Sequence, residues 1–157
     1  MRIGFLRFDF YAFNFEFRTF KMVLKTGKNN SDNFAISNTT SSKLPRLPFL
    51  AMKEAVLGKK YELSVVFVSR QKIRQLNREH RGKNNATDIL SFPLSKTSGE
   101  IFINIEESQK EAEKFGRKFE NFLGFLFIHG LVHLEGFQHG SRMEKIEIFH
   151  RKKFRIN

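Results

Sequence analysis

Three of the chain's five histidines lie close together, in the stretch His129-Gly-Leu-Val-His133-Leu-Glu-Gly-Phe-Gln-His139. Residues four apart are neighbours on one face of a helix, so the imidazoles of His129 and His133 can aim at one point. Gly136 suits the left-handed conformation that ends a helix, after which the chain can turn back and bring His139 to the same point. Three neutral imidazoles with an open fourth position are typical of a catalytic zinc-type site.

The residues that lead into this stretch predict a buried helix, because apolar side chains occur on nearly all of its sides. They are Phe119, Phe122, Leu123, Phe125, Leu126, Phe127, Ile128, Leu131, Val132 and Leu134. A buried imidazole without a partner costs about 1–3 kcal/mol, and a metal ion would supply that partner. The alternative is three separate histidines, each hydrogen-bonded to the backbone or capping the helix end.

One position in the stretch argues against a zinc peptidase. Peptidases with a His-Glu-x-x-His helix carry their general base directly after the first histidine. Here that position is Gly130, which has no carboxylate. The sequence therefore indicates a metal-binding helix with a different chemistry.

The histidine stretch resembles the signature His-Gly-x-Leu-His-Leu-x-Gly-Tyr-Asp-His of the YbeY family, bacterial metal-dependent endoribonucleases of rRNA maturation and ribosome quality control. A second stretch, Leu76-Asn-Arg-Glu-His-Arg-Gly-Lys-Asn-Asn-Ala-Thr-Asp-Ile-Leu-Ser-Phe-Pro93, resembles the family's other hallmark. Gly99-Glu-Ile-Phe-Ile resembles its Gly-Asp-Ile strand. The chain departs from the signature at Phe137 and Gln138, which bears on metal affinity, metal identity and rate.

The resemblance implies a role for each matching residue. His129, His133 and His139 would bind one divalent metal ion, with Zn²⁺ expected, and His129 would also be catalytic. Such a metal keeps its full charge and can lower the pKa of a water in the open position towards about 7. Arg81 matches the family's essential arginine, whose planar guanidinium can clamp a phosphodiester and stabilise transition-state charge.

The net charge of +12 and a pI near 10.2 point to a polyanionic partner, with nucleic acid as the first expectation. Residues 1–31 hold six Lys/Arg against two acids, so +8 remains on the rest of the chain. Four cations precede the strand expected at 88–94, and we expect them to bind along an RNA backbone. The alternative is that they form a solvated surface. They are Arg70, Arg74, Arg78 and Lys83.

The function expected from these features is single-strand-specific, metal-dependent endoribonuclease activity in rRNA processing, at the 3′ end of 16S rRNA, and in ribosome quality control. The partners would be single-stranded RNA, rRNA and the ribosome or its small subunit. Two alternatives remain at this point. One is an RNA- or ribosome-binding factor with a structural metal, and the other is a zinc peptidase.

The chain has no cysteine, which excludes a disulfide-linked partner and thiolate metal ligands and agrees with a cytoplasmic protein. The Phe-rich segment 1–31 has polar interruptions such as Asp9 and Arg18, so we expect no membrane span or signal peptide. We expect residues 1–31 to be disordered or an artefact of annotation, with translation starting at Met22. Residues 32–157 would form a single endoribonuclease domain.

Interleaved strand and helix patterns predict an α+β domain, zincin-like through the resemblance, with about four strands in a mixed sheet packed on the central histidine helix. Strands are expected at 34–37, 61–68, 88–94 and 100–105. Helices are expected at 48–57, 69–77, 106–114, 119–135 and 143–154. In the last helix, Ile146 and Phe149 would face the core.

Three further polar residues have structural interpretations. Thr87 and Asp88 are expected to satisfy backbone donors around the loop that precedes their strand. Glu100 is also expected to be structural, with the alternative that its carboxylate reaches a metal-bound water.

Overall fold

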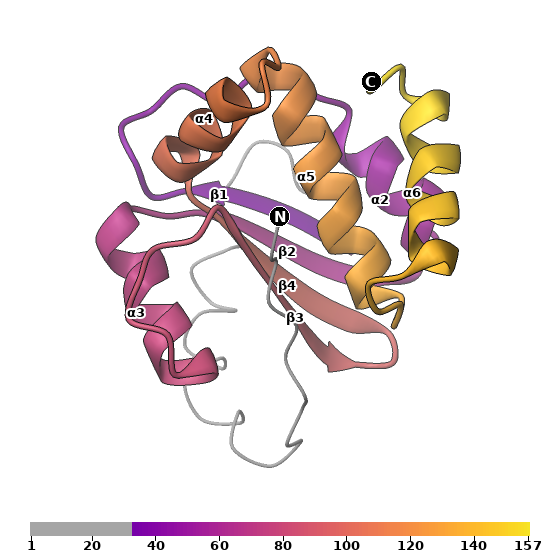
Figure 1. The fold of residues 1–157 in the computed structure, drawn as a ribbon. Coiled ribbons are helices and arrows are strands. Elements are labelled where there is room, and N and C mark those ends of the chain that lie inside the picture. Colours follow the sequence, from indigo (N-terminus) through magenta and orange to yellow (C-terminus); the bar gives the residue numbers. More distant parts are fainter. Residues whose placement is uncertain (1–32) are drawn as a thin grey trace.

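A four-stranded mixed sheet forms the centre of the computed structural model, which describes residues 33–157 (Figure 1). The predictions for residues 1–31 lie outside these described residues. The strand order is β1-β2-β4-β3. The strands are β1 (Phe34–Asn38), β2 (Glu62–Phe67), β3 (Ile89–Ser95) and β4 (Ser98–Ile103).

The strands β1, β2 and β4 are parallel, and β3 runs antiparallel to β4 at one edge of the sheet. Pro93 lies in β3, which fits an edge strand because proline cannot donate a hydrogen bond to a neighbour. The short connection between β3 and β4 makes them a hairpin. The predicted α+β domain with a four-stranded mixed sheet is confirmed.

Helices cover both faces of the sheet (Figure 1). The helix α3 (Arg70–Arg81) packs on one face, where Ile73 and Leu76 meet side chains such as Phe92 and Phe102. The other face carries α2 (Phe49–Leu57), α4 (Ile105–Lys114), α5 (Phe119–Leu134) and α6 (Ser141–Lys153). Successive side chains of a strand point to opposite faces, so each strand contributes to both cores.

The histidine helix α5 is central, as predicted. Leu126, Phe127, Ile128, Leu131 and Val132 are fully buried in the larger core. Because this helix is apolar on nearly every side, it can pack against the sheet, α2, α4 and α6 at once. The polar groups it carries are therefore held in fixed positions.

Two helices differ from the sequence prediction. The helix α3 continues to Arg81 rather than stopping at Asn77, and it ends at Gly82, whose φ of 64° is left-handed. The prediction failed because the last turn of α3 is charged and solvent-facing, a composition shared with loops. In α6 the buried residues are Met143, Glu147 and His150, whereas Phe149 is 66% exposed, so the predicted inward position of Phe149 is wrong.

Among residues 33–157, none of the helices is both long enough and apolar enough to cross a membrane.

Candidate metal centre

The structure brings His129, His133 and His139 together, with one ring nitrogen of each within 4.8 Å of the others. His129 and His133 project from adjacent turns of α5. Gly136 adopts a φ of 102°, which turns the chain after the helix as predicted, and the following loop brings His139 back. His129 is buried, His133 is partly buried and His139 is exposed, so the group opens to solvent on one side.

A carboxylate from another helix fixes the orientation of the His129 ring. The Nδ1 atom of His129 is hydrogen-bonded to Oε1 of Glu147, which lies on α6. Both side chains are almost completely buried. A carboxylate can only accept at neutral pH, so Nδ1 carries the proton and the lone pair of His129 lies on Nε2.

His133 is oriented in the same way by the backbone. Its Nδ1 atom donates to the carbonyl oxygen of Phe137 at 2.9 Å. The lone pair of His133 therefore also lies on Nε2, and the Nε2 atoms of the two rings are only 3.0 Å apart. Two lone pairs at this separation repel each other unless a cation lies between or beside them.

This donor set fits a divalent metal ion. Tetrahedral coordination with metal–nitrogen bonds of ~2.0–2.1 Å places ligand nitrogens about 3.3 Å apart, close to the spacing of the two Nε2 atoms. Nδ1 hydrogen bonds to a carboxylate and a carbonyl are the usual way to fix metal-binding histidines. Imidazole nitrogens suit zinc and neighbouring transition metals better than magnesium or calcium.

Burial keeps the second ligand uncharged. It lowers the pKa of His133 to about 4, and the neighbouring His129 contributes to this shift. His133 is therefore neutral at physiological pH, which is the form that can bind a metal.

Gly130 explains why this helix carries no peptidase base. A Cβ atom at this position would lie 2.8 Å from Cδ1 of Ile89 and 2.9 Å from Oγ of Ser91. The helix α5 therefore presses directly on β3 at Gly130, and the space a glutamate would need is filled by the sheet. The position of Gly130 excludes the His-Glu-x-x-His arrangement for steric as well as chemical reasons.

Phe137 and Gln138 differ from the family signature, but the hydrogen bonds that orient His129 and His133 are still present. Phe137 contributes its backbone carbonyl, which any residue type can supply. The carboxylate that orients His129 comes from Glu147, outside the signature. Sequence reasoning missed Glu147, although the spacing of Met143, Glu147 and His150 does place a carboxylate on the inward face of the last helix.

Arg81 is not part of the histidine group. It lies in the last turn of α3, and this helix packs on the face of the sheet opposite α5. Burial lowers the pKa of Arg81, and the nearby carboxyl of Asp88 opposes this effect. The guanidinium remains charged at neutral pH.

The expected structural role of Asp88 agrees with its contacts. Its Oδ1 atom accepts hydrogen bonds from the backbone N–H of Ile89 at 2.9 Å and from Oγ1 of Thr87 at 3.2 Å. Burial raises the pKa of Asp88, while these hydrogen bonds lower it. Glu100 alternates with Ile101 along β4, so its side chain points to the α3 face rather than to the histidines.

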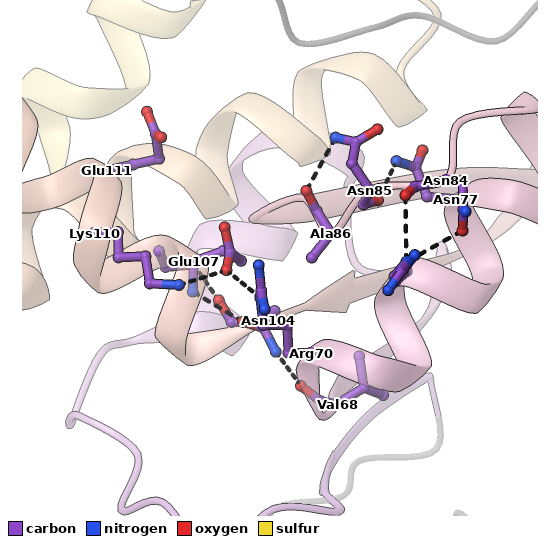
Figure 2. A network of polar contacts seen from close by, with 12 residues as sticks. Val68, Arg70, Asn77, Asn84, Asn85, Ala86, Asn104, Glu107, Lys110 and Glu111 are labelled. Carbon is purple, nitrogen blue, oxygen red and sulfur yellow. Dashed lines mark hydrogen bonds and ion pairs between the residues drawn. The ribbon is translucent and has the colours of Figure 1, made fainter.

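The four candidate RNA-binding cations differ in their surroundings. Figure 2 shows Arg70 directed at Glu107, which it meets at 2.8 Å and which also binds Lys110. Arg74 donates to the side-chain and backbone oxygens of Asn84 at 3.1 and 3.2 Å. Arg78 and Lys83 are exposed at the end of α3 and in the loop after it. Two of the four therefore have protein partners already.

Fold and site together define an α+β protein whose central helix carries a three-histidine site able to hold a metal ion. The chain belongs to the endoribonuclease YbeY family, whose model matches residues 27–157. Members of this family are named for hydrolysis of RNA phosphodiester bonds, so the chain is an endoribonuclease of that family.

Individual relatives agree with this assignment. The endoribonuclease YbeY of Staphylococcus carnosus is 34% identical over 140 residues, covering 82% of this chain and 87% of the relative. The endoribonuclease YbeY of Bacillus velezensis is 35% identical over 122 residues, covering 68% and 77% of the two chains. A solution structure of a Thermotoga maritima protein is similar with a TM-score of 0.55 and 25% identity, covering 78% of this chain and 91% of that one.

Proposed function

We propose that this endoribonuclease is metal-dependent and specific for single-stranded RNA, and that it acts on rRNA at the 3′ end of 16S rRNA and in ribosome quality control. Its partners would be rRNA and the ribosome or small subunit, in the cytoplasm. The observation that carries the metal dependence is the convergence of the Nε2 atoms of His129 and His133, 3.0 Å apart with both Nδ1 atoms occupied. The rRNA substrate rests on family membership.

In this proposal His129, His133 and His139 hold one Zn²⁺ ion. The metal would act as the Lewis acid that activates water and polarises the phosphodiester. Glu147 and the Phe137 carbonyl keep the two buried rings in the binding tautomer, and His129 is also catalytic. This role of His129 rests on family membership, and its contact with Glu147 would hold the metal-binding ring in a fixed position.

Arg81 has a separate role in the proposal, which rests on its match to the family's essential arginine. With the RNA strand passing over the edge strand β3, its guanidinium would reach the phosphodiester from the α3 side and stabilise the additional negative charge of the transition state. Arg70, Arg74, Arg78 and Lys83 would contact the RNA backbone. Their loss should weaken binding without changing the position of cleavage, because phosphate contacts carry no sequence information.

The test is cleavage of an end-labelled RNA by zinc-loaded wild type, Arg81→Ala and His133→Ala, with and without chelator. Matched single- and double-stranded substrates and a fragment spanning the 3′ end of 16S rRNA test specificity. Arg46→Ala is the charge-matched control, because Arg46 is exposed in the segment before α2.

We expect wild type and Arg46→Ala to cleave single-stranded RNA and chelator to stop both. Arg81→Ala should lose about 10²–10³-fold in rate with unchanged zinc affinity, as when one oxyanion-stabilising donor is removed. His133→Ala should lose zinc and activity together. Equal cleavage by all four proteins would reveal a contaminating nuclease. RNA binding without any cleavage would instead favour a binding factor with a structural metal.

A further inference from the structure

An open pocket of about 610 Å³ lies where the beginning of α5 meets the end of α6, away from the histidines. Figure 1 shows these two helix ends at the same end of the molecule, next to the C-terminus. The pocket is lined by Gly116, Arg117, Lys118, Asn121, Arg151 and Asn157. Three of these six side chains are cationic, and none of the six side chains is acidic.

Two of the cations are fixed against one aromatic ring. The guanidinium carbon of Arg117 lies 4.8 Å from the ring centroid of Phe125, and that of Arg151 lies 5.2 Å from the same centroid. Arg117 also donates to Oδ1 of Asn121 through Nε and Nη2, at 3.1 and 2.6 Å. The two like charges are therefore held against the same ring, close enough for the charge of Arg151 to affect Arg117.

Their charge is not neutralised within the described part of the chain. None of the ion pairs among residues 33–157 includes Arg117, Lys118 or Arg151. The Nε atom of Arg151 is buried and has no hydrogen-bond partner among these residues. Burial lowers the pKa of Arg117, and the charge of Arg151 lowers it further. A buried donor without a partner and two adjacent cations both favour an anion in the pocket.

The helix α5 adds to this preference. It begins after Lys118, so the first backbone N–H groups of a 16-residue helix lie at the pocket. Such N–H groups and the positive end of the helix dipole favour anions. Glu120 in this first turn acts in the opposite direction, but it is exposed and does not line the pocket.

The pocket is connected to the metal centre through two packed helices. The ring of Phe125, against which both arginines lie, is 6.1 Å from the ring of His129. On α6, Arg151 follows Glu147 by one turn. Arg151 contacts Phe125 of α5, and Glu147 contacts His129 one turn further along α5. From Asn121 to His129 the helix rises about 12 Å. This length corresponds to the span of a few nucleotides of an extended strand.

We propose that this pocket, built around Arg117 and Arg151, binds a backbone phosphate of the RNA substrate a few nucleotides from the scissile bond. The inference rests on the proposed function, because it takes the histidine group as the cleavage site. Guanidinium forks suit phosphate better than lysine does, since they present paired N–H donors in a plane. The pocket would fix the path of the strand along the α5–α6 surface.

The test measures binding of a short fluorescent single-stranded RNA to zinc-loaded protein at several salt concentrations, with the RNA checked for integrity on a gel. The variants are Arg117→Gln, Arg151→Gln and Arg117→Lys, and the control is Lys43→Gln, an exposed residue in the loop between β1 and α2. Melting curves and zinc titrations verify that each variant folds and keeps its metal centre.

We expect each glutamine variant to weaken binding and to reduce the slope of log K against log salt by about 0.7, the value for one phosphate contact to a single strand. Arg117→Lys should keep most of the slope while losing affinity, because it keeps the charge but not the fork. Lys43→Gln should match wild type. If wild type cleaves RNA and the glutamine variants bind like Lys43→Gln, the pocket assignment is overturned while the proposed function stands.

Two other outcomes would also overturn the assignment of the pocket to RNA. If wild type neither binds nor cleaves RNA, the proposed function fails and the pocket assignment fails with it. Melting curves with inorganic phosphate test whether the pocket binds free phosphate instead of a phosphate of RNA. Stabilisation by phosphate that Arg117→Gln removes, together with unchanged RNA binding, would assign the pocket to free phosphate and overturn its assignment to RNA.

Discussion

His129 and His133 face each other through Nε2 atoms that lie 3.0 Å apart, while the Nδ1 atom of each ring is engaged by an acceptor. The acceptors come from different parts of the fold, a carboxylate on α6 and a backbone carbonyl after α5. The two rings therefore cannot relieve their mutual repulsion by exchanging tautomers without breaking a buried contact. The fold therefore forms a binding site for a positive charge between these two rings.

The Glu147 carboxylate should tune metal affinity through His129. Glu147→Gln keeps an acceptor oxygen but removes the negative charge, so we expect zinc affinity to fall by about tenfold, and Glu147→Ala by up to about 100-fold. Competition with a chromophoric chelator measures both values. Glu144→Gln, an exposed change on the same helix, is the control and should leave the affinity unchanged. Equal affinities for all four proteins would rule out this role of Glu147.

Zinc binding should stabilise the folded protein, because the three histidines converge only in the native state. At a free zinc concentration 100 times the dissociation constant, the gain is about 2.7 kcal/mol. For a domain of this size the gain corresponds to a rise in Tm of roughly 5–10 °C. His133→Ala should abolish the rise, and Mg²⁺ should not produce it, because magnesium prefers oxygen ligands. A Tm independent of zinc in wild type would contradict the site.

The sequence predicted the histidine group because its spacing is local: two residues on one helix face and a third after a glycine turn. It also predicted the sheet, because alternation in β2 and β4 is strong. It did not predict the role of Glu147. The helical spacing places this carboxylate on the inward face of α6, but its contact with His129 depends on how α6 packs on α5, which is a long-range relationship. The same is true of Arg117 and Arg151, which are brought to one place only because both pack on the ring of Phe125.

The pH dependence of stability should reveal the burial of Tyr61. Its hydroxyl is buried without a hydrogen-bond partner among the described residues, and burial raises its pKa to about 12 from an ordinary value of 10.0. The unfolded chain therefore loses this proton more easily, and the contribution of Tyr61 to stability, complete below pH 10, is lost as the pH rises towards 12.

Tyr61→Phe removes this titration and a hydroxyl that makes no hydrogen bond with the described residues. We expect it to be neutral or stabilising by up to about 1 kcal/mol at pH 7. Urea unfolding of both proteins from pH 8 to pH 11 measures the effect, and other titrating groups cancel in the difference. The advantage of Tyr61→Phe should grow above pH 10. A constant difference across this range would show that the hydroxyl is not desolvated in the folded state.

Gly130 should tolerate a side chain poorly, because three side chains of the sheet lie close to it. A Cβ there would meet Cδ1 of Ile89 at 2.8 Å, Oγ of Ser91 at 2.9 Å and Cδ1 of Ile101 at 3.3 Å. In an exposed helix, Gly→Ala is stabilising by about 1 kcal/mol. Here we expect Gly130→Ala to lower the free energy of unfolding by about 1–3 kcal/mol, because overpacking outweighs helix propensity.

Equilibrium unfolding in urea measures the effect of Gly130→Ala, and a double-mutant cycle with Ser91→Ala identifies its cause. Removing Oγ of Ser91 relieves one of the two closest contacts, so the double variant should recover part of the loss but not all of it, since Ile89 remains. Additive effects would place the strain elsewhere. Zinc affinity should fall together with stability in Gly130→Ala, because lifting α5 off β3 also moves the adjacent His129 relative to Glu147.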